Sequence, residues 1–343
     1  MADAEPEAKR RAPVGPVLGT VVPRFAGRAT FCRLPALDEV SNVAVAYLGV
    51  PFDGGCSFRP GARFGPSAIR QASRNLRTQF HPAYDVEPHP RIAEPFQHEQ
   101  AADAGDVSCN PFCIGDALTV IETTANEVLD SAKALVCLGG DHTIALPLLR
   151  TVHRLHGPVA LIHIDAHLDT WDTYFGAPHT HGTPFRRAAE EGLFLSDASV
   201  HIGIRGPLYS RLDLASDAAL GFCVIHCDEF TTKGLPDILN RVRERVGTNP
   251  VYLSIDIDSL DPAHAPGTGT PEIAGMSSRE MLGLLRGLQG LQVVGCDIVE
   301  VSPSYDHAEI TSLAAATIAF EQTMLLMKSD LAMGRKPKNH TAA

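Results

Sequence analysis

Short apolar runs alternate with amphipathic stretches along most of this chain. The apolar runs have the length of β-strands and lie at residues 43–50, 101–107, 134–140, 158–165, 199–205, 221–227, 250–258 and 291–301. Helical periodicity follows at residues 115–134, 235–246 and 277–289, the last with Ser277 or Ser278 as N-cap ahead of Glu280. This alternation predicts an α/β fold with a mainly parallel sheet and covering helices. An open three-layer sheet and a closed eight-fold barrel both fit, and both place an active site at the carboxyl ends of the strands.

The length of 343 residues is enough for one large core, so we expect a single domain over residues 23–330. Residues 1–22 are charged and rich in Pro and Ala, and residues 331–343 are polar. We therefore expect a flexible N-terminal tail and a polar C-terminal tail.

Composition excludes several classes of function. The formal charge of -11 argues against a nucleic-acid partner and weakly favours cationic ligands. The eight cysteines include no CxxC pair, so a zinc ribbon has no support. The first 20 residues lack the apolar segment of a secretory signal, and no apolar stretch approaches the roughly 20 residues of a membrane helix. We expect a cytoplasmic protein without a membrane partner.

Polar side chains with metal-binding chemistry follow the buried run at 158–165. The sequence HIDAHLDT places His163, Asp165, His167 and Asp169 on alternate positions, which share one face if the strand continues through them. Two unscreened charges about 4 Å apart repel by roughly 4 kcal/mol at an effective dielectric of about 20, so carboxylates that converge at a buried strand end need a cation. His163 lies deeper in the strand, and we interpret it as core or as a partner of a ligand.

Two further strands end in similar side chains. GGDHT presents His142 where a helix begins, and SIDID ends a strand with Asp256 and Asp258, two positions apart. The predicted metal ligands are two imidazoles and four carboxylates: His142, Asp165, His167, Asp169, Asp256 and Asp258. Two divalent ions would balance four carboxylates, and this thiolate-free set favours Mn(II), with Ni, Co or Zn as substitutes. Two such ions about 3.5 to 4 Å apart can share a hydroxide, a strong nucleophile at neutral pH.

These motifs resemble those of the ureohydrolases, the family that includes arginase and agmatinase. GGDHT, DAHLDT and SIDIDSLDPAHAPGTGTPE are similar to its three metal-binding signatures, and the likeness runs from about Pro23 to about Leu326. The resemblance implies a three-layer α/β/α fold around an eight-stranded parallel sheet and a binuclear manganese centre held by the six side chains. It also implies hydrolysis of a guanidinium group to urea, by a homotrimer or homohexamer.

Further motifs resemble the agmatinase branch. They are PFDGGCSFRPGARFGPSAIR, HGTPFRRA, HIGIRG and DIVEVSPSYDHAEITS, whereas the serine and asparagine loop by which arginases hold the substrate's α-carboxylate is not seen after Asp169. The resemblance implies that His181 shuttles protons and that Glu300 pairs with the substrate guanidinium. The alternatives are a loop histidine bound only to backbone and a strand-end salt bridge. The glycine-rich loop at 53–65 lines the substrate entrance or is only a helix entrance.

The predicted reaction is hydrolysis of agmatine to putrescine and urea. Asp169 would take a proton from the attacking hydroxide and pass it to the leaving amine. Asp172 is a candidate for binding the distal ammonium, and a solvated loop charge is the alternative. Other guanidino substrates share the metal signature, namely 4-guanidinobutyrate, proclavaminate or guanidine itself. A single-zinc hydrolase and a metal-free, non-catalytic relative are more distant alternatives.

Overall fold

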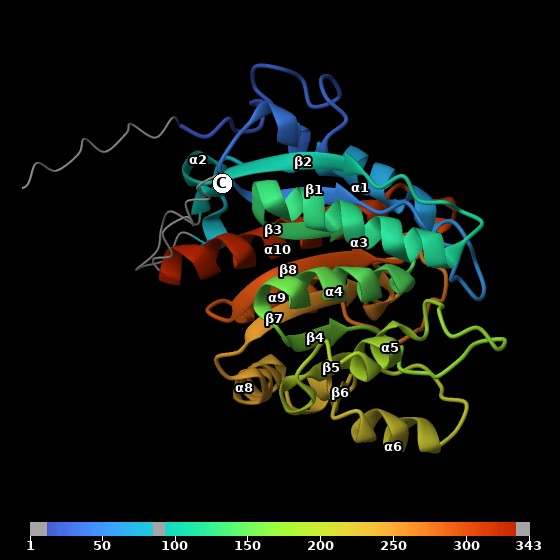
Figure 1. Ribbon diagram of the computed structural model, residues 1–343. Helices are drawn as coiled ribbons and strands as arrows, with labels where there is room; N and C mark the ends of the chain where they lie inside the picture. Colours follow the sequence, from blue (N-terminus) through green and yellow to red (C-terminus); the bar gives the residue numbers. More distant parts are fainter. Residues whose placement is uncertain (1–11, 85–92, 334–343) are drawn as a thin grey trace, which may run out of the picture.

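A computed structural model of the protein describes residues 12–84 and 93–333. In these residues eight parallel strands form one open sheet in the order β2-β1-β3-β8-β7-β4-β5-β6 (Figure 1). The strands are β1 (Val43–Gly49), β2 (Gln100–Asp106), β3 (Ala132–Leu138), β4 (Ala160–Ile164), β5 (Val200–Ile204), β6 (Cys223–His226), β7 (Pro250–Asp256) and β8 (Gln292–Val299). Each of the eight predicted strands is present, and the sheet is open rather than closed into a barrel. The prediction of a three-layer fold is therefore confirmed.

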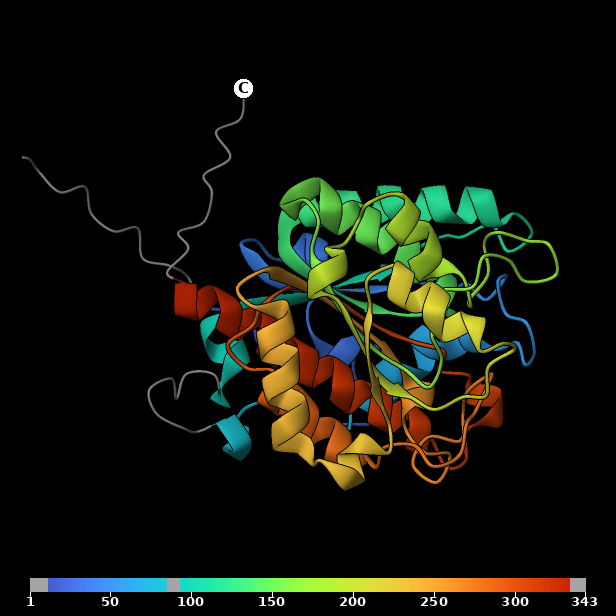
Figure 2. The ribbon, with the colours of Figure 1, turned by 90° about the horizontal axis from the view of Figure 1, so that it is seen from below.

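Helices cover both faces of the sheet (Figure 2). One face carries α3 (Ile114–Ser131), α4 (Ala145–His156) and α5 (Pro184–Glu190), whose apolar side chains pack on the strands. The other face carries α1 (Gly65–Ser73), α8 (Leu235–Val246), α9 (Ser278–Gly287) and α10 (Ile310–Met333). The remaining α-helices are α2 (Pro95–His98), α6 (Leu212–Ala219) and α7 (Glu229–Thr232). Each face of the sheet has its own apolar core cluster.

Local sequence signals explain several boundaries. Helix α8 has the bounds predicted from its periodicity, and it ends at Gly247 with φ 62°, a backbone conformation that glycine adopts without strain. Helix α9 begins after Ser277, whose side chain accepts a hydrogen bond from Glu280 N while the Glu280 carboxylate accepts one from Ser277 N. This reciprocal capping box identifies Ser277 as the N-cap, one of the two residues predicted.

Helix α10 corrects one sequence-based expectation. Its residues Ile310–Met327 form an 18-residue window of mean hydropathy 1.4, so this helix is long and apolar enough to cross a membrane by length and composition alone. In the structure 78% of that window is buried, because the helix packs along α1, α9 and β8. A helix that is enclosed by protein on several sides has apolar residues around most of its circumference, and the sequence of α10 has this pattern.

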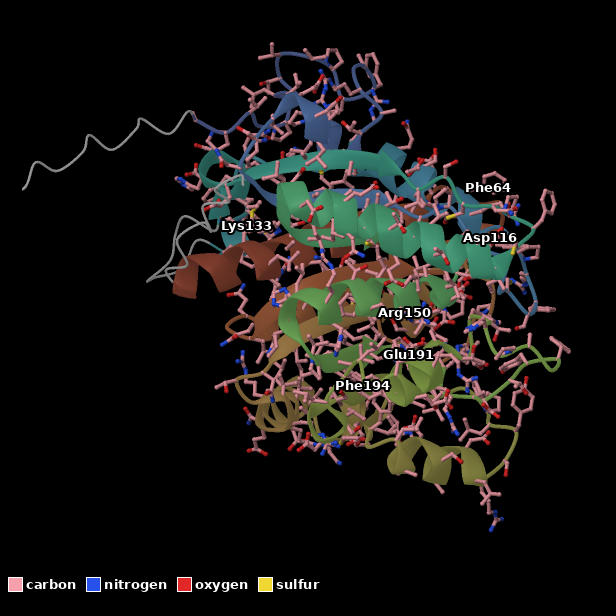
Figure 3. The ribbon with its side chains drawn as sticks, viewed as in Figure 1. Phe64, Asp116, Lys133, Arg150, Glu191 and Phe194 are labelled. Carbon is pink, nitrogen blue, oxygen red and sulfur yellow. The ribbon has the colours of Figure 1, made fainter. Side chains whose placement is uncertain are left out.

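Two helices of one layer are also tied together at the surface. Arg150 on α4 donates two hydrogen bonds, of 2.7 and 2.6 Å, to the carboxylate of Glu191 at the end of α5 (Figure 3). Within the predicted N-terminal tail, Val14 exchanges backbone hydrogen bonds with the Gln100 side chain. Residues 1–11 and 334–343 of the predicted tails lie outside the described residues, and the domain boundaries at 22 and 330 stay predictions.

Candidate metal centre

The predicted ligands gather at the carboxyl edge of the sheet's four central strands. In space these strands are ordered β3, β8, β7 and β4. His142 follows β3, the segment from Asp165 to Asp169 follows β4, and Asp256 and Asp258 lie at the end of β7. Adjacent parallel strands end on one edge of a sheet, so residues distant in sequence meet there. Five of the six predicted ligands thus fall into two neighbouring groups, and the sixth, Asp256, faces His142. All six are buried except His167, which is half-buried.

His142 faces three carboxylates with a free ring nitrogen. Its Nδ1 lies 2.9 Å from Asp169 Oδ2, 3.2 Å from Asp165 Oδ2 and 3.4 Å from Asp256 Oδ2, yet none of the three makes an aligned hydrogen bond, and Nδ1 is a buried atom without a partner.

The opposite side of the same ring explains why Nδ1 is free. His142 Nε2 lies 2.9 Å from Ser254 Oγ, and Ser254 donates its own proton to Asp297 Oδ1 at 2.7 Å. Because that hydroxyl hydrogen is already used, Ser254 accepts from His142 Nε2–H. Burial lowers the pKa of His142, but the facing carboxylates of Asp165, Asp169 and Asp256 outweigh burial and raise that pKa well above its usual value. A cation that takes the place of the Nδ1 proton would therefore bind a nitrogen already aimed at the carboxylates.

Asp165 connects this group to a second one. Its Oδ2 faces His142, and its Oδ1 lies 3.4 Å from His167 Nδ1. The same Nδ1 lies 3.2 Å from Asp258 Oδ2. The potential ligand atoms of Asp165, His167 and Asp258 all lie within 4.8 Å of one another, and so do those of His142, His163, Asp165 and Asp169. Two neighbouring groups that share one carboxylate match a site for two ions.

The strand geometry predicted for HIDAHLDT is wrong beyond Ile164. Strand β4 ends there, and Asp169 has φ 53°, a left-handed conformation that a continuing strand does not contain. The turn, rather than strand alternation, brings the Asp169 carboxylate back to His142. His163 is fully buried within β4 and contacts Asp165, in agreement with its interpretation as core or as a partner of a ligand.

The buried carboxylates of the cluster repel one another. Burial, together with the neighbouring charges of Asp258 and Asp165, raises the pKa of Asp256 far above its usual value. Burial also raises the pKa of Asp258 to about 6 and raises that of Asp169. Such a cluster is unfavourable unless positive charge compensates it. Together with the free Nδ1 of His142, this shows that the residues fit a pair of divalent cations.

His181 and Glu300 form a buried pair beside this cluster. His181 Nδ1 lies 3.2 Å from Glu300 Oε1, which also accepts a hydrogen bond from His142 N at 2.9 Å. Burial lowers the pKa of His181, but its hydrogen bond and charge contact with Glu300 outweigh that effect and raise the pKa to about 9. Glu300 has φ 63°, an uncommon conformation for a non-glycine residue and one that recurs at functional sites.

The glycine-rich loop at 53–65 packs against this pair. Ser57 Oγ lies 2.6 Å from His181 Nε2, and Gly55 O accepts a hydrogen bond from His181 N. Gly55 N in turn donates to the buried carboxylate of Asp141 at 2.7 Å. A side chain at Gly55 would clash with Thr143 Oγ1, so the close approach requires glycine there. The loop is therefore more than a helix entrance, since it holds His181 in place.

Four residues of this site were not predicted from the sequence: Ser57, Asp141, Ser254 and Asp297. Asp141 lies within GGDHT, and Ser254 lies two positions before Asp256, so their motifs carried a signal. Ser57 and Asp297 also lie within quoted motifs, PFDGGCSFRPGARFGPSAIR and DIVEVSPSYDHAEITS, but their roles depend on partners from distant segments of the chain. Asp172, predicted as a substrate ligand, has an exposed side chain whose carboxylate accepts a hydrogen bond from Arg187 at 2.5 Å.

Comparison with known proteins gives consistent matches across the chain. The sequence model of the arginase family matches residues 43–325. The chain is 45% identical to guanidinopropionase from Pseudomonas aeruginosa, covering 92% of this chain and 96% of the relative. It is 42% identical to the mitochondrial agmatinase of Gallus gallus, over 89% of this chain and 87% of the relative. Among solved structures, proclavaminate amidino hydrolase from Streptomyces clavuligerus has a TM-score of 0.83 at 41% identity, covering 90% of this chain and 99% of that one.

Proposed function

This chain belongs to the arginase family, and on that premise we propose that it hydrolyses the guanidinium group of a small linear substrate to urea and a primary amine. One observation carries the proposal. The six clustered metal-binding side chains lie beside a buried His181–Glu300 pair, so a site for cations and a site for a planar cation adjoin each other.

Two divalent ions bound by the six side chains would supply Lewis acidity and a water of lowered pKa. Glu300 binds the substrate, because its carboxylate accepts two parallel hydrogen bonds from a guanidinium. A side chain on Gly269 would begin 3.5 Å from Glu300 Oε2, so glycine leaves room beside that oxygen. Asp169 accepts a proton from the attacking water and passes it to the leaving amine, while His181 exchanges protons through Nδ1 or Nε2.

Manganese is the metal we propose, because four carboxylates and two imidazoles without a thiolate suit Mn(II), with Ni, Co or Zn as substitutes. Elemental analysis of the purified protein tests the stoichiometry. Two ions per subunit are expected, whereas one zinc per subunit would favour the single-zinc alternative.

Agmatine is the first candidate substrate, with putrescine as the amine product. The agmatinase-like motifs and the agmatinase relative support it, and the net charge of -11 favours a cationic ligand. Its distal ammonium needs an anionic or wet environment. Asp172 could supply the charge only by exchanging its Arg187 partner for the substrate.

A guanidino acid is the second candidate, and one observation favours it. Arg59 is half-buried, with its guanidinium 5.4 Å from the centre of the Phe58 ring and 5.1 Å from that of Tyr305. No ion pair with a carboxylate is found for it among the residues that the structure describes. Arg59 O lies 3.0 Å from the point where a side chain on Gly269 would begin, the same point that lies near Glu300. An arginine whose backbone lies beside the guanidinium site carries a planar fork suited to binding a substrate carboxylate bidentately.

Urea release from a panel of substrates tests both candidates. The Mn(II)-loaded protein is assayed with agmatine, 4-guanidinobutyrate, 3-guanidinopropionate, arginine and guanidine. Preference for agmatine supports the first candidate, and preference for a guanidino acid supports the second. The absence of urea from every compound would overturn the proposed function.

The variant Arg59→Gln sharpens the choice. If Arg59 binds a carboxylate, its replacement should raise KM for guanidino acids at least about 10-fold, the loss expected when a charged hydrogen-bonding partner is removed. The matched variant Arg59→Lys keeps the charge but not the planar fork, so it should restore only part of that affinity. An unchanged KM in Arg59→Gln would remove the argument for the second candidate.

A further inference from the structure

The His181 ring has a hydrogen-bonding group at each of its two nitrogens. Nδ1 lies 3.2 Å from Glu300 Oε1, and Glu300 is 1% exposed. That oxygen also accepts a hydrogen bond from His142 N, so it belongs to the interior of the site. On the other edge of the ring, Nε2 lies 2.6 Å from Ser57 Oγ and 3.2 Å from Ser57 N. A proton on the Nδ1 side therefore stays within the site, whereas Nε2 is turned toward the glycine-rich loop.

Ser57 lies where this loop reaches the solvent. It is half-buried, and the nearby residues Gly54 and Phe58 are exposed. The ring of Tyr174 also lies near His181, with ring centres 6.4 Å apart, but the Tyr174 hydroxyl donates its hydrogen bond to Tyr209. Within residues 12–84 and 93–333, Ser57 is the hydrogen-bonding partner found for His181 Nε2.

Backbone hydrogen bonds anchor the loop on both sides of Ser57. Gly55 N donates to Asp141 Oδ2 at 2.7 Å, and Gly55 O accepts a hydrogen bond from His181 N at 3.0 Å. Beyond Ser57, Gly61 N donates at 2.8 Å to Asp53 Oδ2, a buried carboxylate. These bonds fix Ser57 relative to His181. The short contact between Ser57 Oγ and the ring is thus a consequence of how the loop is anchored.

The Ser57 hydroxyl differs in one respect from the Ser57 backbone N–H beside it. The N–H can only donate a hydrogen bond, whereas the hydroxyl both donates and accepts. When a proton passes from Nε2 to Oγ, the hydroxyl can release its own proton to a water molecule, and the reverse sequence returns a proton to the ring. One proton has then crossed, and Ser57 is unchanged. The hydroxyl therefore suits exchange in both directions.

We propose that the Ser57 hydroxyl connects His181 to the solvent, so that protons enter and leave the ring through Nε2 while Nδ1 stays directed at Glu300. Ser57 acts through His181 and is therefore a positioning residue. The inference rests on the proposed function, in which His181 exchanges protons, and it adds the route that those protons take.

The variants Ser57→Thr and Ser57→Val test the proposal as a matched pair. Their side chains have the same shape, and both keep the backbone N–H, but only threonine has a hydroxyl. Urea release from agmatine and from 4-guanidinobutyrate is measured with the Mn(II)-loaded variants. We expect kcat of Ser57→Val to be at least about 10-fold below that of Ser57→Thr, since proton transfer by a positioned group contributes about 100-fold or more. Their KM values should be the same, because Glu300 is intact. Equal kcat values, or a loss that appears in KM, would overturn the proposal.

A second readout does not depend on turnover. In the Zn(II)-loaded variants with ¹⁵N-labelled histidine, NMR measures the exchange of the His181 ring proton with water. We expect this exchange to be at least about 10-fold slower in Ser57→Val than in Ser57→Thr, because a methyl group neither donates nor accepts a hydrogen bond. Equal exchange rates would overturn the proposal even if no guanidino compound is hydrolysed. The absence of urea release by the wild-type protein would instead overturn the proposed function.

Metal content separates proton exchange from damage to the metal centre. Ser57 has no hydrogen bond to any of the six predicted ligands in the part of the chain that the structure describes, so both variants should bind as much Mn(II) as the wild-type protein. A loss of Mn(II) in Ser57→Val but not in Ser57→Thr would show that the hydroxyl supports the metal centre, and it would overturn the proposal.

The variant Ser57→Ala covers the case in which neither branched side chain is tolerated in the loop. Alanine leaves a gap that water or a small buffer molecule can enter. Proton exchange should then depend on the buffer, so kcat should rise with buffer concentration in Ser57→Ala and not in the wild-type protein. A wild-type kcat that does not respond to the buffer in Ser57→Ala would overturn the proposal.

Discussion

The role of a side chain at this site depends on its neighbours as well as on its residue type. Two buried histidines, His142 and His163, lie near the same carboxylates but differ in what binds their far nitrogens. The far side of each ring is held by a residue further from the cluster, Ser254 in one case and His201 in the other.

Replacement of Asp169 with Asn should nearly abolish turnover. The amide keeps the size of the side chain but loses the charge facing His142 and the ability to accept a proton. We expect kcat to fall at least about 100-fold, the usual contribution of a general base or acid. Asp116→Asn, on the exposed side of α3, is the control and should keep its activity. A variant of Asp169 with most of its activity would contradict its role.

His181 should make the metal-free protein less stable at high pH. Its folded pKa of about 9 lies above the ordinary 6.5, so its stabilising contribution is complete below about 6.5 and is lost as the pH rises through about 9. At 1.36 kcal/mol per pH unit the contribution is on the order of 3 kcal/mol. Urea denaturation at pH 6 and pH 10 measures it. His181→Gln should lose this part of the pH dependence, and an equal dependence in both proteins would refute the assignment.

At the scale of elements, strands were predictable and loops were not. The eight strands could be predicted because each is a short apolar run bounded by turn residues, and β4 and β7 are buried along almost their whole length. The long helix α10 was missed because burial on several sides removes the polar stripe that marks an amphipathic helix. The turn at Asp169 was missed because its left-handed backbone has no sequence signature outside glycine and asparagine. The metal-binding residues could be predicted from their types and spacing. Their arrangement in space could be known only from the fold.

Arg205 should matter more than its position suggests. It follows β5 and donates hydrogen bonds to the backbone carbonyls of Asp258, Glu272 and Ile273, at 2.7, 2.7 and 3.0 Å. It thereby closes the segment between Asp258 and Ile273, which contains part of the metal cluster.

A lysine at position 205 keeps the charge but cannot reach several carbonyls at once. We expect Arg205→Lys to lower the free energy of unfolding by about 1 kcal/mol, since part-buried carbonyls lose a charged donor. It should also weaken Mn(II) binding. Chemical denaturation and calorimetry measure the two effects. A variant with wild-type values in both would show that the segment between Asp258 and Ile273 does not depend on Arg205.

At the scale of the whole molecule, removal of the metal ions should destabilise the protein. The cluster buries four carboxylates, and cations that bind only the folded state stabilise it in proportion to the logarithm of their concentration. At 100 times Kd a single ion contributes about 2.7 kcal/mol. Scanning calorimetry with and without a chelator should show a lower Tm in the stripped protein, restored by Mn(II). A Tm that is unchanged by the chelator and by added Mn(II) would argue against a metal centre.

The spatial order of the central strands also governs when the site can exist. Strand β8 is the last of the sheet to be synthesised, yet it lies between β3 and β7. Until the ribosome has released it, the earlier strands can pair only as two separate half-sheets, β2-β1-β3 and β7-β4-β5-β6. His142 belongs to one half and the five aspartate and histidine partners belong to the other. A nascent chain therefore cannot bring His142 to the other five side chains through a continuous sheet until β8 has been synthesised.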